Sequence, residues 1–72
     1  MSMSKYISSV SITFAPKDNY SMEPMVTTVL SLDFAVGSTV LQATAYINKN
    51  PLVHQYLNKY HIINLLFQYS EL

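Results

Sequence analysis

The sequence predicts a small α+β domain with a mixed four-stranded sheet, in the order strand, helix, strand, strand and a short final helix. Three patterns predict this order. Apolar and polar side chains alternate over residues 5–16, apolar side chains recur at helical spacing over residues 22–32, and alternation returns over residues 39–47. We expect a single domain spanning residues 1–72, because no repeat, linker or low-complexity tract divides the chain.

The first strand is predicted over residues 5–16, KYISSVSITFAP, which are rich in β-branched side chains. Strict alternation places Val10, Ile12 and Phe14 on an apolar face and Ile7 on the opposite face. Pro16 is expected to end the strand.

A helix is predicted next, over about residues 22–32. Ser21 is a suitable N-cap, Glu23 suits the positive end of the helix dipole, and Pro24 is tolerated in a first turn. The apolar side chains at helical spacing are Met22, Met25, Val26, Val29 and Leu30.

Gly37 and Ser38 then interrupt the pattern, and residues 39–47 are predicted to form the second strand. The motif NKNP, residues 48–51, has the composition of a turn, so Pro51 is expected to begin a third strand over residues 51–57.

Asn58 and Lys59 are predicted to form a two-residue hairpin connection, with Asn58 at a left-handed φ. Under this hypothesis Lys59→Gly is neutral or stabilising. A short fourth strand over residues 60–64 then leads into a helical turn near Leu65, and a continuous helix from Lys59 is the alternative.

Composition favours a chain that is buried in an assembly. Half of the 72 residues are hydrophobic, only 11% are charged and the formal net charge is zero. An ordinary soluble domain has about 25% charged residues. The longest uncharged run, residues 34–48, is too short and too polar for a membrane span, and residues 1–6 show neither a transit nor a signal pattern.

The residue inventory disfavours an enzyme. The chain has no Cys, so thiol redox chemistry is excluded, and its single Gly cannot build a phosphate-binding loop. His54 and His61 could face each other across the predicted hairpin, but two ligands are too few for a metal site. We therefore expect no catalytic, metal or cofactor residue and no small-molecule substrate.

Two segments carry a resemblance to a known family. KYISSVSITFAP and NKNPLVHQYLNK resemble the thioredoxin-like domain shared by several mitochondrial ribosomal proteins and a small accessory subunit of respiratory complex I. The similarity is greatest to mitochondrial large-subunit ribosomal proteins of the fifty-three type. It implies a thioredoxin-like β-α-β-β-(α) domain without redox cysteines.

The resemblance implies a non-catalytic structural component of the mitochondrial ribosomal large subunit, located in mitochondria. RNA affinity grows with the number of neutralised phosphates, and this chain has four lysines and no Arg. It should therefore pack mainly on neighbouring ribosomal proteins, with rRNA contacts at an edge. The candidate RNA contacts are Lys5, Lys17, Lys49 and Lys59. The alternatives are an accessory subunit of respiratory complex I and an unrelated interaction module that forms homo-oligomers.

Overall fold

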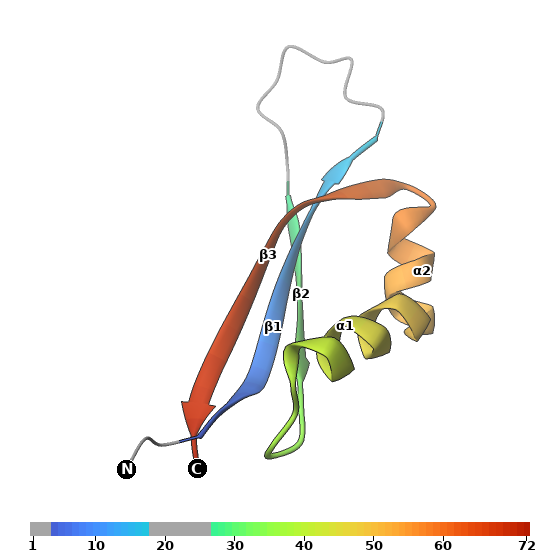
Figure 1. Cartoon of the computed structure of the whole chain (residues 1–72). Coiled ribbons are helices and arrows are strands. Elements are labelled where there is room, and N and C mark those ends of the chain that lie inside the picture. Colours follow the sequence, from blue (N-terminus) through green and yellow to red (C-terminus); the bar gives the residue numbers. More distant parts are fainter. Residues whose placement is uncertain (1–3, 18–26) are drawn as a thin grey trace.

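The computed structural model describes residues 4–17 and 27–72. Their elements, in chain order, are β1 (Lys5–Pro16), β2 (Thr28–Asp33), α1 (Val40–Lys49), α2 (Pro51–Leu57) and β3 (Tyr60–Glu71). The three strands form one antiparallel sheet in the order β2-β1-β3, and both helices lie on one side of it (Figure 1). The prediction of a mixed four-stranded, thioredoxin-like β-α-β-β-(α) sheet is therefore wrong, and the described elements form a three-stranded antiparallel α+β arrangement.

β1 has the predicted bounds and is the central strand. Val10, Ile12 and Phe14 are fully buried, as their alternation predicts. Ile7 is also buried, although strict alternation places it on the other face. The register against β3 shifts between Ile7 and Ser9, so Ser8 is an extra residue in a β-bulge that returns Ile7 to the core face.

The hydrophobic core lies between β1 and the two helices. Ala43 and Ile47 of α1 and Val53 of α2 are buried against the β1 side chains. No polar or charged side chain of the described residues is buried. Apolar packing therefore holds the two layers together.

Residues 40–49 form a helix, so the strand predicted over residues 39–47 is wrong. The Thr39 hydroxyl accepts a hydrogen bond from the Gln42 amide at 3.1 Å, and the Gln42 side chain accepts one from the Thr39 amide at 2.9 Å. This reciprocal capping box is signalled by a Thr followed three residues later by a Gln. Ala43 and Ile47 are one helical turn apart and share the buried face.

Residues 51–57 form a second helix, so the strand predicted there is also wrong. The Asn50 side chain accepts hydrogen bonds from the amides of Leu52 and Val53, at 2.9 and 3.2 Å, and caps the helix. Pro51 occupies the first turn, where its missing N–H group costs nothing and its fixed φ suits a helix. Asn50 and Pro51 therefore begin a helix, whereas the sequence predicted a turn followed by a strand at this point.

The hairpin predicted at Asn58 and Lys59 is absent, because these residues join α2 to β3. Asn58 has a right-handed φ of −69° and ψ of −32°, so the expected left-handed conformation is wrong. The expectation that Lys59→Gly is neutral or stabilising depended on this hairpin, so the structure does not support it. The short strand predicted over residues 60–64 lies within β3, but β3 continues to Glu71. The helical turn predicted near Leu65 and the alternative continuous helix are therefore wrong.

The helix predicted over about residues 22–32 is wrong where it can be compared. Residues 22–26 lie outside the described residues, while residues 28–33 form β2. Leu30 and Leu32 of β2 pack against the core, and the residues that alternate with them, Val29, Ser31 and Asp33, are exposed. The alternation of a half-buried strand therefore prevails over the helical spacing.

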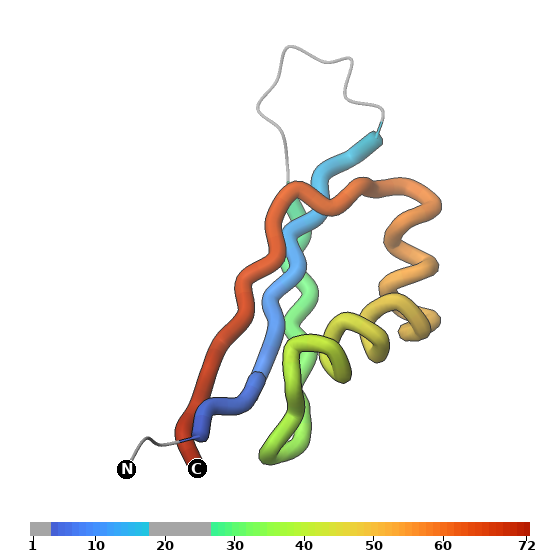
Figure 2. Tube along the Cα trace, viewed as in Figure 1, coloured from blue at the N-terminus to red at the C-terminus, as the bar shows by residue number. Residues whose placement is uncertain are grey.

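The structure is flat and elongated, with extents of 53 × 23 × 14 Å along its principal axes (Figure 2). Its radius of gyration is 14.7 Å, whereas a compact chain of this length has about 11 Å. The Leu72 amide donates a hydrogen bond to the Ser4 carbonyl at 3.0 Å, so the two ends of the described chain meet at one end of the sheet. In this shape the 12-residue edge strand β3 is long relative to the core.

Candidate interaction surface

The sheet face opposite the helices is uncovered among the described residues. Its middle part consists of three cross-strand rows, because directly paired residues share a face of the sheet. The pairs Tyr6–Ser70 and Ala15–His61 extend this face toward the two ends. In these three rows the central strand contributes only small hydroxyl side chains, while the outer strands contribute amides, one carboxylate, one hydroxyl and two exposed apolar side chains. The rows are Asp33–Ser9–Gln68, Ser31–Ser11–Leu66 and Val29–Thr13–Asn64.

Strand β3 carries apolar side chains on both faces. Leu65 pairs with Ile12 and Tyr69 pairs with Ile7, so both lie on the helix side, yet they remain 42% and 57% exposed. Leu66 lies on the open face and is 50% exposed. A strand with one wet face normally alternates apolar and polar side chains, whereas a strand buried on both faces is apolar throughout. β3 follows the first pattern, with His61, Asn64, Gln68 and Ser70 on the open face, and Leu66 is the apolar exception there.

β3 also has few of the features that protect an edge strand from pairing with another strand. β3 is an edge strand of 12 residues, and no described strand pairs with its outer side. Edge strands are usually protected by Lys, Pro, short length or bulges. Residues 60–71 contain no Lys, Arg or Pro, and their one formal charge is at Glu71. The single protective feature is a register shift that leaves Ile63 as an extra, bulged residue.

The sequence-based interpretation missed this surface because residues 60–71 were assigned to a short strand and a helical turn. A signal for the strand was present. The segment IINLLFQY, residues 62–69, concentrates β-branched and aromatic residues in a run that is as compatible with a strand as with a helix.

The four lysines proposed as RNA contacts are all exposed, but the structure does not gather them into one patch. Lys5 begins β1 at one end of the sheet, and Lys49 lies in the last turn of α1. Lys17 and Lys59 meet at the other end, where the Lys17 amide donates a hydrogen bond to the Lys59 carbonyl at 3.1 Å. Only this pair could contact neighbouring phosphates together.

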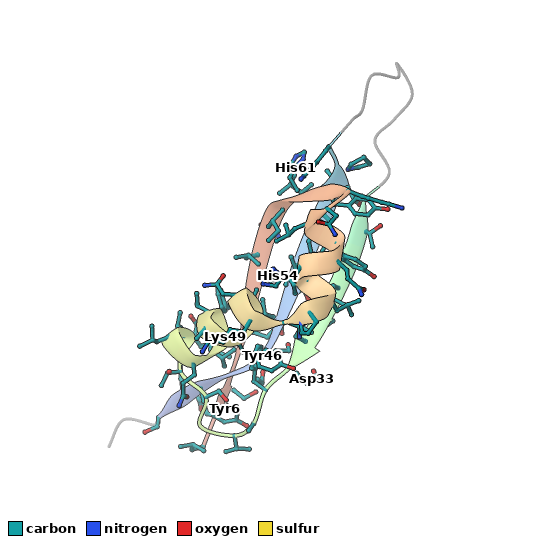
Figure 3. The ribbon with its side chains drawn as sticks, turned by 90° about the vertical axis from the view of Figure 1, so that its right-hand side faces the viewer. Tyr6, Asp33, Tyr46, Lys49, His54 and His61 are labelled. Carbon is teal, nitrogen blue, oxygen red and sulfur yellow. The ribbon has the colours of Figure 1, made fainter. Side chains whose placement is uncertain are left out.

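His54 and His61 do not face each other across a hairpin, which corrects the expectation from the sequence. His54 lies on α2, and its Nε2 atom is in hydrogen-bond contact with the Asn48 carbonyl. His61 lies at the beginning of β3, where it pairs with Ala15 (Figure 3). Residues 4–17 and 27–72 contain no group of three His, Cys, Asp or Glu side chains that could hold a metal ion.

An open depression of about 500 Å³ lies between the end of β2 and the beginning of α1. Phe34 and Tyr46 form part of its wall and pack edge to face, with ring centroids 5.4 Å apart. The Ser38 and Gln42 side chains in its lining are already used within the fold, and the Asp33 carboxylate and Tyr46 hydroxyl also line it. The Ser38 hydroxyl donates to the Ala35 carbonyl at 2.7 Å, and the Thr39 and Gln42 amides are held by the capping box. The depression therefore offers a ligand few free donors.

None of the helices in the described part of the chain is long and apolar enough to cross a membrane. No protein-family model matches the chain, and comparisons with curated proteins and with solved structures gave no significant match.

Proposed function

We propose that this protein is a non-catalytic structural module that works by packing against other protein chains. The observation that carries the proposal is strand β3, an edge strand with exposed apolar side chains on both faces. Among the described residues, eleven large hydrophobic side chains are exposed, and five of them lie on β3 or directly after it: Ile63, Leu65, Leu66, Tyr69 and Leu72. A concentration of exposed apolar side chains on one element is typical of a surface that contacts another protein.

Protein is favoured over RNA as the partner because of the charge distribution. The net charge is zero, and the lysines are divided between the two ends of the sheet and the end of α1. Binding to RNA depends on phosphates that are neutralised together. The uncovered sheet face also lacks a lysine at its paired positions, since its rows hold Ser, Thr, Asn, Gln, Asp, Val and Leu.

The residue inventory supports a non-catalytic role. Without Cys the chain has no thiol nucleophile. A hydroxyl nucleophile needs a base within hydrogen-bond reach. The His54 ring is in contact with a backbone carbonyl, and His61 lies on a different element.

Membership of the mitochondrial ribosomal large subunit, or of respiratory complex I, stays a prediction from the sequence resemblance. The resemblance implied a thioredoxin-like topology, and the sheet has a different one. These two assemblies are therefore specific outcomes to be tested within the broader proposal.

The test is to tag the endogenous protein and sediment a lysate through a sucrose gradient, with and without RNase. We expect the protein to migrate in an assembly that RNase leaves intact, because protein surfaces hold it there. Migration with large-subunit rRNA that collapses after RNase treatment would support the ribosomal prediction instead. Migration as a free monomer in both gradients contradicts the proposal.

A further inference from the structure

Strand β3 offers a backbone edge whose side chains are complementary to themselves in the antiparallel direction. Two copies joined edge to edge are related by a two-fold axis perpendicular to the sheet. Each residue then faces a partner residue on the same face of the extended sheet. Figure 1 shows β3 at the edge of the sheet, with its outer side free of described elements.

In the register that places the two-fold axis at Leu66, apolar side chains face apolar side chains and amides face amides. Leu66 faces Leu66 on the open face, Leu65 faces Phe67 on the helix side, and Asn64 faces Gln68 on the open face. All these residues follow the bulge at Ile63, in the regular part of the strand. Apolar and amide pairs of this kind stabilise neighbouring strands.

The other central register, with the axis at Leu65, is poorer. It sets the amide of Asn64 against the apolar side chain of Leu66. Both registers let almost the whole of Tyr60–Glu71 overlap with its copy, a length of about 40 Å, so the side-chain pairs decide between them.

We propose that two copies of this chain form a dimer through the outer edge of β3, with Leu66 at the two-fold axis and a continuous six-stranded antiparallel sheet. This inference rests on the proposed function and names the partner. In the dimer the outer backbone N–H and C=O groups of β3 are paired, and Leu66, which is exposed on the open face of one copy, packs against Leu66 of the other.

A second copy is favoured over an unrelated strand because β3 is nearly free of charge. Its one carboxylate, at Glu71, is at the end of the strand, far from the axis and from its symmetry mate. Two identical edges can therefore meet without like charges directly opposite each other. The shorter edge strand β2 differs, because it has 6 residues and ends in Asp33.

The test compares Leu66→Lys with Val29→Lys by sedimentation equilibrium of the purified chain. Both residues are exposed, lie on the open face and belong to edge strands, but only Leu66 is on the proposed interface. Two lysines at the axis repel, so the dimer dissociation constant should rise about tenfold or more with Leu66→Lys. It should be unchanged with Val29→Lys. Equal effects of the two changes would overturn the proposal.

Position 66 at the axis is tested by mixing. Leu66→Lys and Leu66→Glu chains should each be monomeric alone and should form a heterodimer together, because each lysine then faces a glutamate. Failure of the mixture to associate would overturn the placement of the axis. Circular dichroism of each variant checks that it is folded.

A cysteine variant keeps the proposal testable if the charged variants do not fold. The chain has no Cys, so Leu66→Cys carries a single thiol. Directly opposite residues of antiparallel strands have Cα atoms about 4.5 to 5.5 Å apart, a separation that a disulfide can bridge. Oxidised glutathione should convert Leu66→Cys, but not Val29→Cys, to a covalent dimer, with release of reduced glutathione. A monomeric Leu66→Cys product would count against the dimer.

The same experiments separate the dimer from the proposed function. A wild-type chain that stays monomeric at high micromolar concentration, while the endogenous protein migrates in an RNase-resistant assembly, refutes the dimer and leaves the structural role in place. In that case a strand of another protein occupies the β3 edge. A monomer under both conditions refutes both.

Discussion

Phe14 connects the central strand to the helical layer. Its side chain is fully buried, and its ring meets the rings of Tyr56 and Tyr60 edge to face, with centroids 5.0 and 6.4 Å away. Tyr56 belongs to α2 and Tyr60 begins β3, so the Phe14 side chain of β1 contacts two other elements. Edge-to-face aromatic pairs contribute about 0.5–1.5 kcal/mol each beyond their buried area.

Phe14→Ala is therefore expected to lower the free energy of unfolding by about 3–5 kcal/mol, through lost burial and a cavity between the layers. Urea unfolding followed by circular dichroism measures the change. Leu41→Ala is the control, because Leu41 is 79% exposed on α1 and such surface changes stay within about 0.5 kcal/mol. Similar midpoints for the two variants would contradict the central role of Phe14.

At the scale of one element, α1 depends on its N-terminal cap. The helix has 10 residues, and only Ala43 and Ile47 are buried. Isolated helices of this length are marginal in water. The capping box at Thr39 and the contact of the buried pair with β1 together account for the helix.

Thr39→Ala should destabilise the fold by about 1 kcal/mol, because the Gln42 amide loses its side-chain acceptor. Thr39→Ser keeps the hydroxyl and should stay close to the wild type. Thermal unfolding of the three chains provides the comparison. If Thr39→Ser lost as much stability as Thr39→Ala, the hydroxyl would not be the stabilising group.

At the scale of the whole molecule, a flat chain with one thin core has little apolar burial to offset the entropy of folding. Domains of this size gain stability from any partner that binds the folded state. The apolar β3 edge and the zero net charge both favour such a partner. The free energy of unfolding of this chain therefore depends on whether its partner is bound.

The midpoint of thermal unfolding should accordingly rise with protein concentration, because a folded dimer is favoured by mass action. Leu66→Lys should remove this dependence, while Val29→Lys should retain it. Differential scanning calorimetry measures the midpoints of the three chains over a hundredfold range of protein concentration. Such a range changes the free energy of association by about 2.7 kcal/mol. A midpoint independent of concentration in the wild-type chain argues against dimerisation.

The amino-acid sequence by itself determined the central strand and the residue chemistry. Residues 5–16 were predicted with the observed bounds, because alternation next to β-branched residues leaves few alternatives. The absence of Cys and the zero net charge limit the chemistry without any structure. Local motifs also identified the chain breaks near Gly37 and Pro51, although the elements on either side were assigned wrongly.

Only the tertiary structure decided the helices, β2, β3 and the interaction surface. Intrinsic preferences for helix or strand differ by less than about 1 kcal/mol per residue. A short segment such as 40–49 or 60–71 therefore takes the form that packs best against β1. The exposed β3 edge and the separation of the lysines depend on which elements become neighbours. Contacts between residues far apart in the sequence determine that arrangement, and a local sequence pattern does not predict such contacts.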